Sequence, residues 1–431
     1  LKASFLGGLG VGADAPLDAV LGAGANSMST SQVRPLPHLT GARTLAQLWI
    51  IWHHMSGWDP ASSLDTITSR VDVSVEFFVL LSGFSTQWAY GKQDLRSSGN
   101  SLAAFYVWRL GRILFTAYLA MVASTFLLFI SNQDVANRHT VECFLFVKPW
   151  IDPMPDCPNI AYWFVAALLP AWLLYPLVVQ APLASTWIRS PKRFACAAGV
   201  VWLVAVAPQF LLISLHRRWM NWREVLFTWF WPPAQLPDFV LGAVAGAAAH
   251  HVPPTPSAGL LADACAGVVV LACVLVPLPG MPEDWDGPRH WRPGHYMAWD
   301  QLSGRVSAPF LALFLYWSAG GGSMLARVLA HPALVSLGGY TLEVFLFQEP
   351  LHYALYYLRS KGFLWLGLPL TVESFIFYVL LLWGLSAAFV ELLALPLQAK
   401  LRAHTLRWAG QPSHPSACSH GGGIGNYTSV A

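Results

Sequence analysis

The stretch ARTLAQLWIIWHH (residues 42–54) is an apolar segment that carries one arginine and ends in two histidines. Arg43 and His54 are eleven positions apart, about three turns of an α-helix, so they share a helix face and lie about 16 Å apart along its axis. An ionisable side chain inside a membrane is costly unless it faces a cavity or a partner. The pair is therefore a candidate functional site. The alternative is that Arg43 extends to the membrane surface and His54 ends the helix.

The composition indicates that the whole chain belongs in a membrane. Of its 431 residues, 55% are hydrophobic and 11% are charged, whereas about 25% of the residues of a typical soluble domain are charged. The 21 tryptophans are typical of a chain with many membrane interfaces, where indole rings are favoured. A net charge of +3 without a long basic run excludes a nucleic-acid-binding protein.

Apolar segments of about 20 residues, the length that crosses the hydrocarbon layer, recur along the chain. They predict an all-α fold, a polytopic membrane protein of about ten transmembrane helices. The eighth segment is short and runs into three glycines (residues 320–322), which predicts a broken helix. We place the spans near residues 40–57, 73–91, 107–131, 160–181, 194–215, 235–251, 258–278, 306–320, 334–358 and 372–398.

The predicted domain organisation is a disordered tail over residues 1–38, a ten-helix domain over residues 39–400 and a second disordered tail over residues 401–431. Both tails are rich in small and polar residues. More Lys and Arg residues fall on the side of the two termini than on the opposite side, and the loops opposite hold most of the acids. This bias predicts an integral membrane protein with both termini in the cytoplasm; it does not indicate which membrane.

Two cysteines fall in the loop between the third and fourth predicted spans. Cys143 and Cys157 lie on the side assigned as non-cytoplasmic, where an oxidising environment permits a disulfide. Spacing alone does not establish the geometry of a disulfide. At this point a bridge and two free thiols both remain open.

The second and third predicted spans also carry charged residues. Asp72 and Glu76 lie one turn apart in RVDVSVEFFVLLSGF (residues 70–84), on one helix face, where they could orient an imidazole. The alternative for Asp72 is a role at the helix N-terminus. Arg109 and Arg112 share a face of FYVWRLGRILFTAYLA (residues 105–120), a spacing that suits a phosphate or pyrophosphate. Arginines at a cytoplasmic membrane boundary are equally what topology alone predicts.

Taken in order, these residues resemble the acyltransferase-3 family of integral membrane acyltransferases. The resemblance begins with an arginine followed, after ten residues, by a histidine, then FFVLLSGF and an RxxR opening of the third span. It continues to about residue 398, and it depends on the ordered series rather than on any one motif. The later segments that match are WFVAALLPAWLLYPLVV (163–179), PDFVLGAVAG (237–246) and SLGGYTLEVFLFQEPL (336–351).

The resemblance implies transfer of an acyl group, commonly acetyl, from acyl-CoA (acetyl-CoA) as co-substrate, without a metal. The acceptor would be a hydroxyl of a carbohydrate, a lipid or another small molecule. His54 would be the catalytic residue, as general base or transient acyl carrier, with Asp72 and Glu76 in support. The donor's phosphates would be held by Arg43, Arg109 and Arg112. The oligomeric state is not implied.

Two positions complicate the resemblance. Gln348 stands where family members often have a histidine in the late helix, and an amide forms hydrogen bonds but does not titrate. His53 adjoins His54, yet adjacent helix positions point about 100° apart. Eleven residues from Arg43 rotate to about 20° and ten to about 80°, which favours His54.

Two functions from other classes remain open. Intramembrane Arg, His and Glu residues also suit a proton-coupled transporter or flippase, although the charged residues gather in the first three spans and we find no inverted repeat. The other is a non-catalytic membrane scaffold with an acyltransferase fold. Acceptor labelling by the purified protein separates the three classes.

Overall fold

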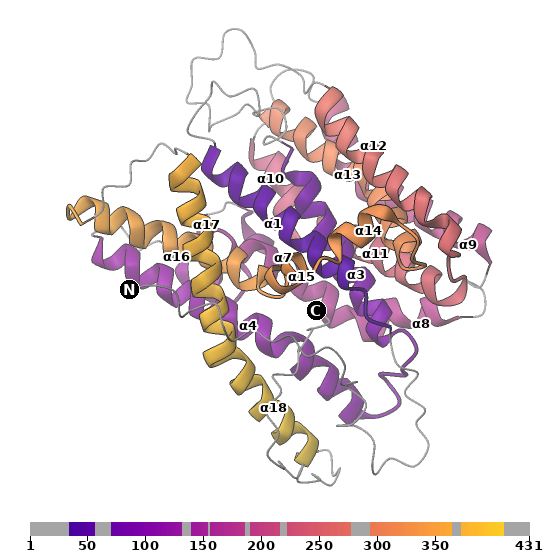
Figure 1. Cartoon of the computed structure of the whole chain (residues 1–431), viewed down its shortest axis with the longest axis horizontal. Coiled ribbons are helices and arrows are strands. Elements are labelled where there is room, and N and C mark those ends of the chain that lie inside the picture. The colour runs from indigo at the N-terminus through magenta and orange to yellow at the C-terminus, as the bar shows by residue number, and fades with distance from the viewer. Residues whose placement is uncertain are drawn as a thin grey trace, which may run out of the picture.

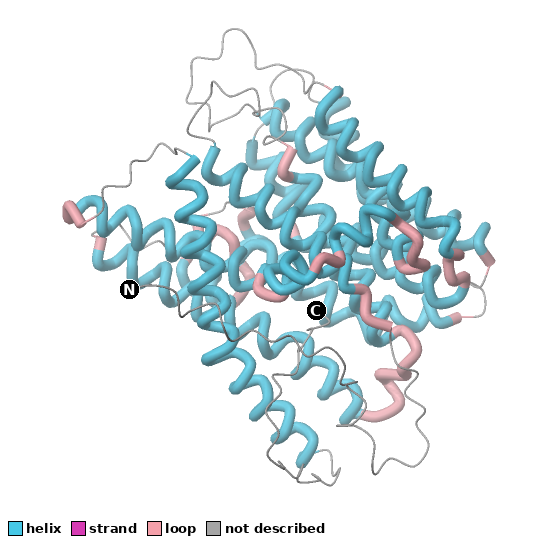
Figure 2. The backbone as a smooth tube through the Cα atoms, viewed as in Figure 1, coloured by secondary structure: helices cyan, strands magenta, loops and turns pink. Residues whose placement is uncertain are grey.

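A computed structural model describes residues 34–56, 70–131, 139–153, 156–185, 190–215, 222–276, 294–363 and 372–408. Within these ranges every regular element is a helix (Figures 1 and 2), which confirms the all-α prediction. The elements are α1 (Pro37–Ser56), α3 (Asp72–Tyr90), α4 (Gly99–Ile130), α5 (Thr140–Phe144), α6 (Lys148–Ile151), α7 (Tyr162–Leu174), η2 (Tyr175–Val179), α8 (Gln180–Ala184), α9 (Pro191–Leu215), α10 (Trp222–Phe230), α11 (Pro232–His251), η4 (Pro256–Ala258), α12 (Gly259–Leu275), α13 (Gly294–Ser318), α14 (Met324–Leu329), α15 (Pro332–Gly338), α16 (Thr341–Ser360), α17 (Val372–Phe389), η5 (Val390–Ala394) and α18 (Leu395–Trp408).

The predicted number of ten membrane spans is not confirmed. Among the described residues, five helical segments are long and apolar enough to cross a membrane: Gly99–Ile130, Tyr162–Ala184, Pro191–Leu215, Pro256–Leu275 and Glu373–Leu401. The other predicted spans coincide with α1, α3, α11, α13 and α15–α16. Except for α15, these helices bury polar or charged side chains in the interior of the bundle, which makes them less apolar than peripheral helices such as α9.

The predicted break in the eighth segment is wrong. Helix α13 runs without interruption from Gly294 to Ser318. The break lies in the ninth segment instead, where α15 ends and α16 begins after Tyr340, whose backbone is not helical (φ −107°, ψ 3°). Gly338 at the end of α15 lies against α1 so closely that a Cβ there would overlap the backbone oxygen of Thr40. Contact with α1 therefore fixes the point at which the chain turns into α16.

Helices α3 and α11 form the centre of the bundle. Gly83 of α3 faces the backbone oxygen of Phe239, and Gly242 of α11 faces that of Leu80; a Cβ at either glycine would overlap that oxygen. The small side chains of α11 thus allow the two backbones to touch. Helix α1 packs against α3 on one side and against α14, α15 and α16 on the other. Helices α4 and α18 lie side by side and extend from one end of the bundle (Figure 1).

Cys143 and Cys157 form a disulfide, with their Cα atoms 5.9 Å apart. It joins α5 to the residues just before α7, and both cysteines are buried. Between them, Lys148 is buried and forms ion pairs with Asp152 at 3.1 Å and Asp156 at 3.0 Å. The question that the sequence left open is therefore answered: the two thiols are bridged.

The two predicted tails lie almost entirely outside the described residues. Of residues 1–38, only residues 34–38 are described, and α1 already begins at Pro37. Of residues 401–431, residues 401–408 are described, and they continue α18 to Trp408. The helical part of the chain therefore extends past the predicted boundary at residue 400.

Candidate active site

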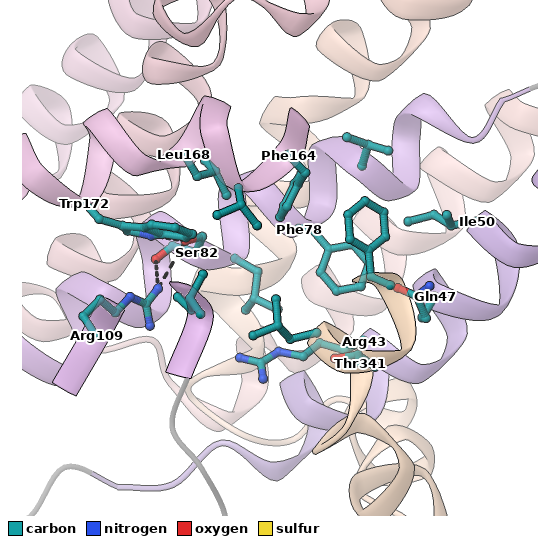
Figure 3. A pocket seen from close by; sticks show the side chains of 16 residues that line it. Arg43, Gln47, Ile50, Phe78, Ser82, Arg109, Phe164, Leu168, Trp172 and Thr341 are labelled. Atoms are coloured by element: carbon teal, nitrogen blue, oxygen red, sulfur yellow. Dashed lines mark hydrogen bonds between the residues drawn. The ribbon is translucent and has the colours of Figure 1, made fainter. Parts of the chain in front are cut away.

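A cavity of about 110 Å³ lies between α1, α3, α4, α7 and α16. Its wall is mostly apolar, with Ile50, Phe78, Phe164 and Leu168 among the lining residues. Figure 3 shows the two arginines of the cavity, Arg43 and Arg109, together at one end of it. The cavity therefore has a cationic end and an apolar body.

Arg43 reaches this cavity from the second turn of α1. Among the described residues, it forms no hydrogen bond or ion pair with a carboxylate. Among the described residues, the charged groups that act on it are Arg109 and Arg112, both cations. A guanidinium in this position is left without a compensating negative charge, so the site favours an anion.

Arg109 is buried and is held by neutral groups. Its Nη2 donates to the Ser82 hydroxyl at 3.2 Å and to the Ser82 backbone oxygen at 3.5 Å. Its guanidinium lies 5.6 Å from the ring centre of Trp172, whose Nε1 donates to the same hydroxyl at 2.9 Å. The close contact of Gly83 with α11 fixes this part of α3. Arg109 is thus positioned at the cavity while its charge remains uncompensated within the described part of the chain.

Arg112, one turn further along α4, has a different environment. It binds Glu343 of α16 through two hydrogen bonds, from Nε at 2.8 Å and from Nη2 at 2.6 Å. Its Nη2 also donates to the backbone oxygen of Gly339 at 3.0 Å, and Thr116 donates to Glu343 at 3.4 Å. Arg112 is therefore neutralised by a carboxylate and ties α4 to the start of α16, and it does not line the cavity.

His54 lies in the last turn of α1 and is exposed. Its Nδ1 lies 2.9 Å from Oε1 of Gln348, and Nε2 of Gln348 donates to the backbone oxygen of Phe345 at 3.3 Å, which turns Oε1 toward the imidazole. An amide oxygen only accepts hydrogen bonds, so this network assigns the proton to Nδ1. Nε2 of a neutral His54 then keeps its lone pair.

Glu76 does not contact His54, contrary to the predicted arrangement. Its carboxylate lies 3.2 Å from Nη1 of Arg305 on α13, and the same Nη1 forms an ion pair with Asp238 of α11. Asp72 lies near this cluster, since its backbone packs against Gly304 and its charge acts on Arg305. For Glu76 the predicted pairing with an imidazole is wrong, because its carboxylate faces Arg305 of α13 and not α1. For Asp72 the pairing stays a prediction.

A second cavity, of about 380 Å³, lies between α9, α11 and α13. Its lining consists of apolar residues together with Tyr316 and Trp202, and it includes none of the predicted site residues. The cavity beside α1 is therefore the candidate site.

Comparison with known proteins decides the class. A family model described as an acyltransferase domain, of the acyltransferase-3 type, matches residues 36–390, most of the chain. This chain belongs to the acyltransferase-3 family. Acyltransferase MdmB from Streptomyces mycarofaciens is 25% identical over 277 residues, which cover 56% of this chain and 68% of that protein. No solved structure matches. The resemblance in the sequence is thus confirmed, and the chain is a membrane acyltransferase.

Within this acyltransferase, the structure brings together residues that sequence reasoning did not connect. Gln348 appeared only as a departure from the family pattern, yet it contacts His54. Glu343 was not among the predicted site residues, yet it binds Arg112. Trp172 and Gln47 line the cavity without having been singled out. For Gln47 a signal existed: it stands four residues after Arg43, on the same helix face.

Proposed function

We propose that this membrane acyltransferase moves an acyl group, in the first instance acetyl, from acyl-CoA to a hydroxyl of a small-molecule, lipid or carbohydrate acceptor. One observation carries the proposal. Helix α1 presents Arg43 to a cavity that contains a second cation, and it presents His54 eleven residues later. Within the described residues, Arg43 has no carboxylate partner and Nε2 of His54 has no hydrogen-bond partner. Donor binding and proton transfer would thus be placed on one rigid element.

The residues that line the cavity support an acyl-CoA donor. The donor carries phosphates at one end and a thioester at the other, joined by a long flexible arm. The cavity runs beside α1 from Arg43 past Gln47 to Ile50, one turn before His54. With the phosphates at Arg43 and Arg109, the arm extends along α1 and the thioester approaches His54. Guanidinium groups suit the phosphates because they form two charge-assisted hydrogen bonds at once.

His54 then acts as the general base. Nε2 accepts the proton of the acceptor hydroxyl as its oxygen attacks the thioester carbonyl. The carbon–sulfur bond breaks, and the imidazolium returns the proton to the leaving thiolate. Gln348 holds the tautomer through Nδ1 in both states, because an amide oxygen accepts a hydrogen bond from neutral and from protonated imidazole. The same Nε2 lone pair would serve an acyl-imidazole route, which differs in that labelled protein accumulates before acceptor is added.

The remaining predicted site residues receive different roles. Arg112 forms an ion pair with Glu343 and donates to the backbone oxygen of Gly339, so we assign it to positioning: it holds α16, and with it Gln348, against α4. Asp72 and Glu76 belong to the Arg305 cluster and act on the structure of the bundle rather than on the imidazole. Direct contact with the donor is left to Arg43 and Arg109.

A comparison of His54→Ala with His53→Ala tests the proposal, since the two variants remove adjacent imidazoles from one helix. Purified protein in detergent is given radiolabelled acetyl-CoA, and thiol release and acceptor labelling are measured. We expect His54→Ala to lower turnover by about 10²- to 10⁴-fold and His53→Ala to retain most of it. Full turnover in His54→Ala would contradict the assignment. Movement of label across the membrane without acceptor modification would favour a transporter.

We also propose that both termini face the cytoplasm. Arg43 and Arg109 then lie toward the side that supplies acyl-CoA, because each stands in the N-terminal half of its helix. The disulfide between Cys143 and Cys157 follows the end of α4 and falls on the opposite side, where oxidising conditions permit it. Protease protection of C-terminally tagged protein in sealed vesicles of known orientation checks this topology.

A further inference from the structure

Gln47 lines the cavity of the proposed active site with both polar atoms of its side chain unsatisfied. The residue is fully buried, and neither Oε1 nor Nε2 has a hydrogen-bond partner among the described residues. Figure 3 shows it between Arg43 and Ile50. A buried amide without partners costs about 1–3 kcal/mol, and such groups are rare in folded proteins unless a ligand or water engages them.

The position of Gln47 along α1 restricts what that ligand group is. Gln47 follows Arg43 by one helical turn and precedes His54 by seven residues, about 10 Å of helix. It therefore stands between the cationic end of the cavity and the imidazole. Its neighbours in the wall do not satisfy it: Val75 and Phe78 are apolar, and the Thr341 hydroxyl, which donates to the backbone oxygen of Gly338 at 3.0 Å, forms no hydrogen bond with Gln47.

The chemistry of the side chain restricts the ligand further. An amide offers an acceptor, Oε1, beside a donor, Nε2. A hydrocarbon chain would satisfy neither atom, and a phosphate, which only accepts, would satisfy Nε2 alone. A secondary amide in the ligand satisfies both, because its N–H donates to Oε1 and its C=O accepts from Nε2.

We propose that Gln47 binds an amide group of the pantetheine arm of the donor. This inference rests on the proposed function, in which the arm joins phosphates at Arg43 to a thioester at His54. The arm contains two secondary amides and must pass the position of Gln47. Gln47 thus selects donors whose arm carries an amide and fixes how far the thioester advances toward His54, because a site built around a hydrogen bond rejects ligands that lack the partner.

The test measures dissociation constants by calorimetry, which needs neither turnover nor a known acceptor. Three probes separate the two ends of the donor: coenzyme A has phosphates and amides, pantetheine has only the amides, and adenosine 3′-phosphate 5′-diphosphate has only the phosphates. The variants are Gln47→Leu, which keeps the volume and removes the polar atoms, and Arg43→Ala. The control is Gln235→Leu, a buried glutamine outside the cavity whose Nε2 donates to Trp229.

We expect Gln47→Leu to weaken coenzyme A and pantetheine by the same factor, about 10- to 100-fold, and to leave the nucleotide probe unchanged. Arg43→Ala should weaken coenzyme A and the nucleotide and leave pantetheine unchanged. Gln235→Leu should change none of the three. The melting temperature of Gln47→Leu should equal or exceed that of the wild type, because the leucine removes an unsatisfied amide, whereas a structural role for Gln47 would lower it.

Unchanged binding of pantetheine and coenzyme A by Gln47→Leu would overturn the inference. If Arg43→Ala still weakened coenzyme A in that case, the donor assignment would stand and only the role of Gln47 would fall. If the wild-type protein bound none of the three probes, the donor assignment itself would fail, and the inference with it.

Discussion

Two groups of arginines in the helical bundle differ in how their charge is balanced. Arg305 is fully buried between α3, α11 and α13, and two carboxylates, Glu76 and Asp238, lie against it. Its Nη2 also donates to the backbone oxygen of Ala234 at 3.0 Å. Arg43 and Arg109 lie at the cavity beside α1, and within the described residues no carboxylate pairs with either.

The difference separates structure from function. A buried cation is tolerated when a partner compensates the loss of hydration. Where the partner belongs to the protein, as for Arg305, the pair holds helices together. Where the protein supplies none, as for Arg43, the compensating charge has to come from a ligand or from water. Arg112 belongs to the first group despite its position one turn from Arg109, because Glu343 binds it.

The largest effect is expected from breaking the balanced cluster. Arg305→Met leaves Glu76 and Asp238 buried without a cation and should lower the free energy of unfolding by about 3–5 kcal/mol. The free energy of unfolding is measured on the purified protein in mixed micelles. The triple variant Arg305→Met, Glu76→Gln, Asp238→Asn removes all three charges and should recover most of that loss. A triple variant as unstable as the single one would show that charge balance is not what stabilises this region.

A second test concerns the pair that joins α4 to α16. Arg112→Ala leaves the Glu343 carboxylate buried without its cation, and Glu343→Gln leaves the Arg112 guanidinium without its anion. Both variants should destabilise the protein. In the double variant the loss should be smaller than the sum by a coupling energy of about 1–3 kcal/mol, obtained from a double-mutant cycle of unfolding free energies. Additive losses would contradict a direct role for the ion pair seen at 2.6 Å.

Removing an uncompensated arginine should weaken ligand binding without lowering the stability of the protein. Arg43→Ala should leave the melting temperature unchanged or raise it, since it removes a cation that repels Arg109 and Arg112. It should weaken coenzyme A binding by about 10- to 100-fold, the size expected for lost hydrogen bonds to a charged group. Arg34→Ala, which removes an exposed arginine of the same segment outside the cavity, is the matched control and should bind normally. If Arg43→Ala lost stability but bound coenzyme A normally, Arg43 would have a structural role like that of Arg305, and our assignment would be wrong.

The smallest effect is expected from salt. Raising the ionic strength from about 0.05 M to about 0.5 M shortens the screening length and should weaken coenzyme A binding a few-fold in the wild type, and less in Arg43→Ala. The stability contribution of the Arg305 cluster should not change, because a fully buried pair is screened little. Equal salt dependence in both proteins would argue against a contact between the donor and Arg43.

The predictions that succeeded used local information. The fifth predicted span, residues 194–215, coincides with α9, one of the five helical segments able to cross a membrane, because an apolar run of fixed length is visible in the sequence itself. For the second, residues 73–91, the helix is confirmed as α3, but the membrane span is not. The predicted break was placed in the wrong segment. The three glycines at residues 320–322 follow the end of α13 and do not interrupt that helix. The break before α16, at Tyr340, follows from contact between α15 and α1, which the sequence does not reveal.

The candidate site was predicted only in part, for the same reason. Arg43 and Arg109 both line one cavity, and their binding of a donor, which the family resemblance implied, stays a prediction. The partners of the other groups come from distant helices: Gln348 is 294 residues from His54, and Glu343 is 231 residues from Arg112. An acid one turn into α3 gave no sign that it would meet Arg305, 229 residues away, rather than an imidazole.

By itself the sequence determined the helical class, the membrane environment, the family resemblance and the common face of Arg43 and His54, because hydropathy and helical periodicity act over neighbouring residues. The tertiary structure alone decided which arginines are neutralised, which group holds His54 and where an amide is left unsatisfied. The residues next to an arginine in the sequence do not indicate whether a carboxylate will pair with it. Only the packing of helices distant in sequence distinguishes Arg112, which pairs with Glu343, from Arg43, which faces a cavity.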